Sequence, residues 1–138
     1  MFKKIMVPVD LAHQGDLRKA LDCAVDLCRH YKAEIVYVGV TSSLPGALAH
    51  TPEEYRDKLR AFADEQAGAT GITSSAEMVL SHDPTVDLDD KLMRAITKAG
   101  ADLVIMQSHM PSVVDYVWPS NGGKIAEHAP CSVMVVRG

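Results

Sequence analysis

The fold is decided by residues 102–137, which read DLVIMQSHMPSVVDYVWPSNGGKIAEHAPCSVMVVR. The first part, 102–107, and the last part, 132–137, are apolar runs of strand length. Between them lies a polar loop, followed by a helix-like segment that begins beside Gly122 and Gly123. A strand, a loop, a helix and a second strand in this order are typical of an open α/β sheet, which binds ligands at the carboxyl ends of its strands.

The start of this helix is the first candidate binding site. Ser120 is a good helix cap, so the backbone N–H groups of Asn121, Gly122 and Gly123 would be unpaired at the positive end of the helix dipole. Such groups can hold a phosphate without a lysine. On spacing alone the alternative is equally good: Ser120 simply caps its helix, and the glycines allow close packing.

Strands and helices also alternate upstream of this stretch. Apolar runs predict strands at 4–9, 34–40 and 76–80, and amphipathic spacing predicts helices at about 14–31, 52–67 and 88–100. The run at 76–80 alternates more than the others, which indicates a strand nearer an edge. Alternation at this spacing implies βαβ units, and hence one doubly wound parallel sheet with right-handed crossovers and helices on both faces.

The bulk properties exclude several classes. A chain of 138 residues is expected to form one domain, residues 1–138, with a real core. A net charge of −4 disfavours nonspecific binding to nucleic acid, which needs a concentrated basic surface. No apolar run approaches the roughly 20 residues that span a bilayer, and no signal-peptide core follows Met1. Three scattered cysteines fit a reducing cytoplasm better than a disulfide framework.

Asp10 is the second candidate for function. It follows Pro8 and Val9 at the carboxyl end of the first predicted strand. A carboxylate in that place can accept from ribose hydroxyls or lie near a Mg²⁺ ion. The alternative is that it caps the first helix or accepts a hydrogen bond within a turn.

Other chemistry finds little support. The chain has neither a G-x-x-x-x-G-K-[ST] loop nor a G-x-G-x-x-G motif after the first strand, which disfavours a motor-type NTPase or a dehydrogenase. Ser81, His82 and Asp83 are adjacent, whereas triad members converge from separate segments. The histidines show no zinc spacing. We therefore expect no catalytic residues and no metal ligands, and His109 is either a ligand contact in the loop or a surface residue.

These segments resemble the universal stress protein family over the whole chain, and most closely its short F/G-type branch. Residues 5–10, IMVPVD, are similar to that family's opening strand, and QSHMP, PSN and HAPCSVMVVR are similar to its closing signature. The resemblance implies a five-stranded sheet of order 3-2-1-4-5, the adenine nucleotide alpha hydrolase-like fold. It also implies a homodimer formed through the last strand, Ser132 to Arg137, and ATP as the ligand, with or without Mg²⁺.

The resemblance also implies a set of nucleotide contacts. They are Pro8, Val9 and Asp10 with adenine and ribose, Val40 with adenine, Met106 and Gln107 beside the sugar, Ser108 and His109 leading into the phosphate loop, and Ser120 and Asn121 with phosphate.

Three positions depart from the family pattern. ATP-binding members carry a glycine where this chain has Gln107, the F/G branch commonly has arginine at Met110, and the family's glycine before the serine is Pro119 here. A lost charge-assisted contact costs roughly 1.5–3 kcal/mol, or about 10- to 150-fold in affinity. These departures would weaken or abolish binding.

Two functions therefore stay open. One is an ATP-binding stress-response protein with slow hydrolysis at most, which Asp10 and the Ser120–Asn121 helix start favour. The other is a nucleotide-independent module that acts through its dimer surface, which Met110 and Pro119 favour. We prefer the first. We expect a dimer under both functions, because an apolar last strand would otherwise leave an open edge of the sheet.

Overall fold

A parallel sheet of five strands, in the order β3-β2-β1-β4-β5, forms the centre of the molecule. This computed structural model describes residues 1–42, 49–82, 84–107 and 122–137. The predicted strand order is confirmed. The elements are β1 (Lys4–Val9), α1 (Arg18–Tyr31), β2 (Glu34–Thr41), α2 (Pro52–Thr70), β3 (Ser74–Leu80), α3 (Pro84–Ala99), β4 (Leu103–Gln107), α4 (Gly122–His128) and β5 (Ser132–Val136).

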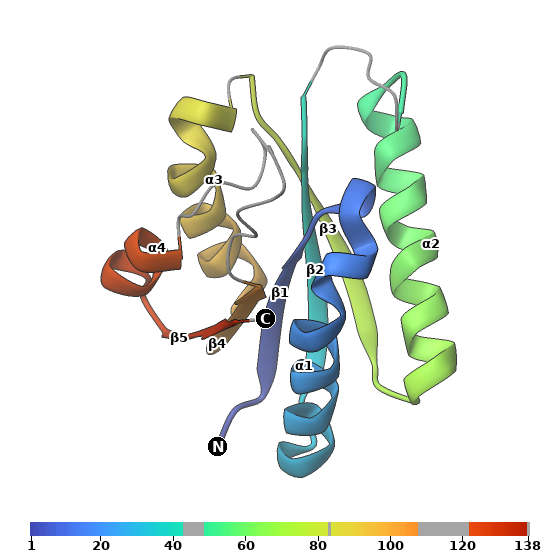
Figure 1. Cartoon of the computed structure of the whole chain (residues 1–138), viewed down its shortest axis with the longest axis vertical. Coiled ribbons are helices and arrows are strands. Elements are labelled where there is room, and N and C mark those ends of the chain that lie inside the picture. The colour runs from blue at the N-terminus through green and yellow to red at the C-terminus, as the bar shows by residue number, and fades with distance from the viewer. Residues whose placement is uncertain (43–48, 83, 108–121, 138) are drawn as a thin grey trace.

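Helices cover both faces of the sheet, as predicted. Helices α1 and α2 lie on one side, and α3 and α4 lie on the other (Figure 1). Alternate residues of the strands enter two separate cores. In β1, for example, Ile5, Val7 and Val9 pack with α1 and α2. Met6 packs with α3 and α4. Strands β1, β2 and β4 are buried over nearly their whole length, as near-continuous apolar runs require in a parallel sheet.

The first helix begins later than the spacing predicts. Asp10 caps a 3₁₀ segment, Leu11–Leu17, and the α-helix proper starts only at Arg18. The backbone of His13 is non-helical, with φ −133° and ψ 48°, and it interrupts the regular turn. The predicted start near Gln14 is therefore wrong, although the apolar stripe of the helix is buried as predicted. That stripe consists of Ala20, Leu21, Ala24, Val25 and Cys28.

Helix α2 has the boundaries that its terminal residues dictate. The Thr51 hydroxyl accepts a hydrogen bond from the backbone N–H of Glu54 at 3.1 Å, and proline occupies the first turn. The helix ends at Gly71, which has a φ of 74° in the left-handed region that glycine adopts without strain. The helix therefore extends three residues beyond the predicted Ala67.

The two edges of the sheet are β3 and β5. Strand β3 pairs with β2 in unbroken parallel register from Ser74 to Leu80, so the prediction that the alternating run lies near an edge is confirmed. Pro8 lies next to the carboxyl end of the central strand β1, opposite Val38. That position limits the effect of its missing N–H on the ladder.

Candidate functional site

The carboxyl ends of β1, β2 and β4 bring several predicted site residues together. Val9 is level with Gly39 in the β1–β2 register, so Asp10 follows at the level of Val40. The β1–β4 pairs are Ile5 with Leu103 and Met6 with Val104. The same offset carried forward puts Val9 level with Gln107. The order of the strands reverses between β1 and β4, which is where open α/β sheets bind ligands.

Asp10 lies at this point and is largely buried, with 11% of its side chain exposed. Its Oδ1 accepts from the backbone N–H of Ala12 at 3.0 Å, and its Oδ2 lies 2.8 Å from Nδ1 of His13. The capping role considered as an alternative is thus present. An ionised carboxylate offers about four acceptor positions, so a capping role does not preclude a ligand contact. A ribose contact at Asp10 stays a prediction.

Gln107, at the end of β4, is bonded to the first turn of α1. Its side-chain Oε1 accepts from the backbone N–H of Ala20 at 3.2 Å, within a buried contact. The cap residue of α1, Leu17, provides no side-chain hydrogen bond, so Gln107 satisfies one of the helix's free donors from a distant strand. Its Nε2 is buried and has no hydrogen-bond partner within the part of the chain that the structure describes.

The apolar site residues belong to different cores. Val9 packs with α1 and α2. Val40 and Met106 pack on the opposite face of the sheet, with α3 and α4. All three are at most 5% exposed, and Pro8 is also buried. A ligand placed above the strand ends would therefore meet Val9 and Val40 mainly through their backbone atoms.

Ser108, His109, Ser120 and Asn121 lie outside the described residues. Their roles with phosphate stay predictions. Met110 and Pro119 also lie outside those ranges.

Tyr55 and His13 are site residues that sequence reasoning missed. Tyr55, on α2, is 4% exposed, and its ring packs against Gly39 near the end of β2. Burial raises the pKa of the Tyr55 hydroxyl, and the negative charge of Asp10 raises it further, which places this hydroxyl within electrostatic reach of the carboxylate. The position of His13 three residues after Asp10 is a weak local signal. No local pattern connects Tyr55 with Asp10.

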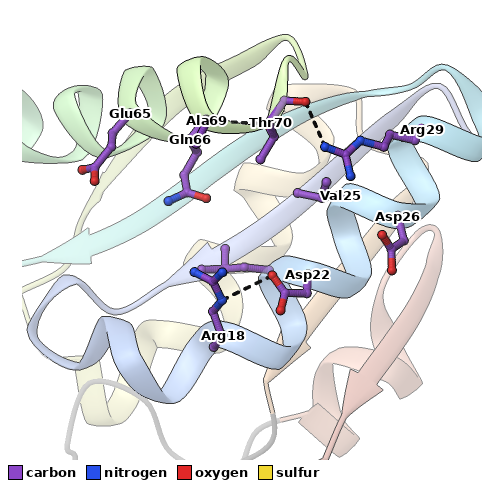
Figure 2. A pocket seen from close by; sticks show the side chains of 10 residues that line it. Arg18, Asp22, Val25, Asp26, Arg29, Glu65, Gln66, Ala69 and Thr70 are labelled. Carbon is purple, nitrogen blue, oxygen red and sulfur yellow. Dashed lines mark hydrogen bonds and ion pairs between the residues drawn. The ribbon is translucent and has the colours of Figure 1, made fainter.

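A groove of about 510 Å³ runs between α1 and α2, and both arginines that line it are already bonded within the protein (Figure 2). Arg18 pairs with Asp22 at 3.4 Å, and both side chains are mostly exposed. Arg29 donates from Nη2 to the carbonyl oxygen of Thr70 at 3.1 Å. Exposed pairs of this kind contribute little to stability or binding. The lining mixes both signs of charge, so we assign this groove no ligand.

Two further observations concern metals and membranes. Among the residues that the structure describes, no group of three or more histidine, cysteine or acidic side chains is arranged to hold a metal ion. The described helices include none that is both long and apolar enough to cross a bilayer.

The family model of the Universal stress protein family matches residues 1–137. The chain belongs to this family. It is 26% identical to a universal stress protein of Staphylococcus haemolyticus over 99% of this chain and 85% of the other. It is 23% identical to universal stress protein G of Shigella flexneri over 99% of this chain and the whole of the other.

Solved structures of universal stress proteins share the fold. A family member from Burkholderia pseudomallei has a TM-score of 0.69 at 22% identity and covers 97% of this chain and 95% of its own. A universal stress protein in complex with cAMP has a TM-score of 0.68 at 17% identity, with 98% and 97% covered. An Arabidopsis thaliana protein with AMP bound has a TM-score of 0.62 at 16% identity, with 98% and 91% covered. One from Archaeoglobus fulgidus with dAMP has a TM-score of 0.60 at 18% identity, with 96% of each chain covered.

Proposed function

We propose that this universal stress protein binds an adenine nucleotide, ATP with or without Mg²⁺, at the carboxyl ends of β1, β2 and β4. One observation carries the proposal. Asp10 and Gln107 lie at the carboxyl ends of the adjacent strands β1 and β4, where the sheet order reverses, in a family whose members have been solved with cAMP, AMP and dAMP. Ligands of open α/β sheets bind where the strand order reverses in this way.

The charges decide how the nucleotide would lie. The carboxylate of Asp10 accepts hydrogen bonds and repels phosphate, so it fits the ribose hydroxyls. Gln107 takes a place beside the sugar, while Pro8, Val9 and Val40 border the adenine with Met106 behind them. The phosphates extend toward the start of α4, where Ser108, His109, Ser120 and Asn121 are the proposed contacts.

We expect hydrolysis to be slow at most. Orienting a water for attack on a phosphate needs a general base or a positioned polar group within hydrogen-bond reach. Asp10 already accepts from Ala12 and His13 and faces the sugar in this arrangement. The proposal is therefore a nucleotide-binding protein in which bound ATP persists.

Calorimetric titration with ATP, ADP and AMP tests the proposal, and we expect binding at micromolar to sub-millimolar strength. Asp10→Asn is the informative variant because asparagine caps a helix about as well as aspartate. It should keep the turn but lose a charge-assisted contact, which weakens binding by about 10- to 150-fold. Asp22→Asn, an exposed carboxylate on α1, is the matched control and should bind like the unmodified protein. An absence of heat with all three nucleotides at millimolar concentration contradicts the proposal.

A second candidate function is that of a dimeric interaction module, and the exposed edge strand β5 favours it. Met134 lies in this strand and is 38% exposed, although apolar side chains of this size are usually buried. We propose a homodimer through Ser132 to Arg137, which would cover this edge. Met134→Asp should then convert dimer to monomer in sedimentation equilibrium. If the unmodified chain sediments as a monomer at high micromolar concentration, a dimer is excluded from both candidate functions.

The proposed location is the cytoplasm. All three cysteines, Cys23, Cys28 and Cys131, are free thiols. A reducing compartment keeps cysteines in this state.

A further inference from the structure

The edge of the sheet opposite β5 has features of a docking site for another chain. Strand β3 is seven residues long and pairs with β2 over its whole length, without a bulge or a proline. Natural edge strands are usually protected by short length, bulges, proline or lysine. Strand β3 carries a single charged residue, Glu77, and none of those devices. Its outward backbone groups are therefore positioned to accept an added strand.

A groove runs along this edge beside α3. It has a volume of about 270 Å³ and is lined by the carboxyl half of β3 and by one face of α3. Val79 forms part of its apolar floor and packs against the α3 core. Leu80, which is 36% exposed, extends that apolar surface to the end of the strand.

The rim of the groove is basic. Lys91, Arg94 and Lys98 are spaced three and four residues apart on α3, so they share one face of the helix. Lys98 Nζ lies 2.6 Å from Glu77 Oε1, and this contact raises the pKa of Lys98. Lys91 and Arg94 make no ion pair within the described ranges. The groove thus holds three cations and one carboxylate, on a chain whose net charge is −4.

We propose that an extended acidic segment of a partner protein adds to the sheet beside β3. Backbone hydrogen bonds to the open edge would provide affinity, as in other strand-addition complexes. Alternate side chains of an added strand point to the same face, so acidic residues at every second position would meet Lys91 and Arg94. This edge lies opposite β5, so docking there and the proposed dimer do not compete. The inference does not depend on nucleotide binding.

The test is a titration of the ¹⁵N-labelled protein with an eight-residue peptide of alternating glutamate and valine, capped at both ends. We expect saturable shifts of the backbone amides of β3 and of residues 91–98. Two control peptides separate the contributions of charge and strand. One alternates lysine and valine. The other is the glutamate–valine peptide with every backbone amide N-methylated, which keeps the charge but cannot donate any backbone hydrogen bond.

Two charge-reversal variants make the matched comparison. The double variant Lys91→Glu with Arg94→Glu should lower the affinity for the acidic peptide by about ten-fold or more, since two attractions become repulsions. Arg56→Glu with Arg60→Glu reverses the same amount of charge on exposed residues of α2 and should change affinity less than two-fold. Glu77→Gln should tighten binding, because it removes the carboxylate and frees Lys98. Circular dichroism checks that each variant is folded, and Lys91→Gln with Arg94→Gln replaces the first variant if it is not.

Several results would overturn the proposal. The first is an absence of shifts at millimolar peptide, and the second is equal binding of the N-methylated peptide. The others are equal weakening of binding by the two charge reversals, and shifts confined to β5. Equal binding of the N-methylated peptide would indicate a nonspecific anion-binding surface instead of strand addition.

Discussion

Gly39 lets Tyr55 pack against the end of β2, and replacing this glycine provides a quantitative test of the site. A Cβ added at position 39 would collide with the hydroxyl oxygen of Tyr55 and would lie 2.9 Å from its Cε1 and 3.1 Å from its Cζ. Tyr55 is 4% exposed and its ring is held among core residues, so it cannot withdraw into solvent. Gly39→Ala therefore forces the ring or the strand to move.

The expected cost follows from the nature of this contact. Adding a methyl group to a packed core typically costs about 1–3 kcal/mol, and three close contacts at one position favour the upper half of that range. We expect Gly39→Ala to lower the free energy of unfolding by about 2 kcal/mol. Out of a total of roughly 5–15 kcal/mol, such a loss is easily resolved by urea denaturation.

A second substitution identifies the cause. Tyr55→Phe removes the closest of the colliding atoms, so Gly39→Ala should cost about 1 kcal/mol less in that background, as a double-mutant cycle measures. Gly68→Ala is the matched control. No atom lies within 4 Å of its added Cβ, and alanine is the better residue within a helix. It should stabilise the protein by about 0.5–1 kcal/mol. An unchanged Gly39→Ala protein, or strictly additive effects in the cycle, would refute this account of the site.

Two further predictions concern Cys28 and Gln107. Burial raises the pKa of the Cys28 thiol from 9.0 to about 11, so the folded state keeps this proton longer than the unfolded state does, and stability should fall as pH rises from about 9 to 11. In urea unfolding between pH 8 and 11, the free energy of unfolding of Cys28→Ala should fall less steeply with pH than that of the unmodified protein. An equal slope for the two proteins would contradict the prediction. Gln107→Leu removes the acceptor of the Ala20 N–H and should cost about 1 kcal/mol. Its specific signature is faster hydrogen exchange at Ala20, which unchanged exchange would disprove.

The sequence was sufficient to predict the architecture because local patterns determine it. The apolar runs of β1, β2 and β4 and the apolar stripe of α1 are buried as their sequence patterns predict. The ends of the helices were predicted less accurately. The start of α1 depends on a non-helical His13 and on the capping of a 3₁₀ segment by Asp10, and the spacing of apolar residues does not record either of them.

The site was predictable only in part, since its contacts join distant segments. Asp10 could be placed at a strand end because it directly follows an apolar run. The bond from Ala20 to Gln107 spans 87 residues, and the packing of Tyr55 on Gly39 joins a helix to a strand. Neither contact leaves a local pattern in the chain. Both become visible only when the register of the sheet is known.

Gln107 also has a consequence for where an anion can be held. Alternation along β4 directs its side chain to the face opposite Met106, where its Oε1 occupies the N–H of Ala20 at the start of α1. An unpaired N–H at a helix start is what a phosphate would otherwise bind. In this chain that donor is already paired, on the α1 side of the sheet, near the point where the strand order reverses. Under the proposed function, we therefore expect the phosphates to be held from the α4 side. Gln107→Gly would release the Ala20 donor and should raise nucleotide affinity in calorimetry. A fall in affinity would contradict this and would show that the proposed contact of Gln107 with the sugar contributes more than the released donor.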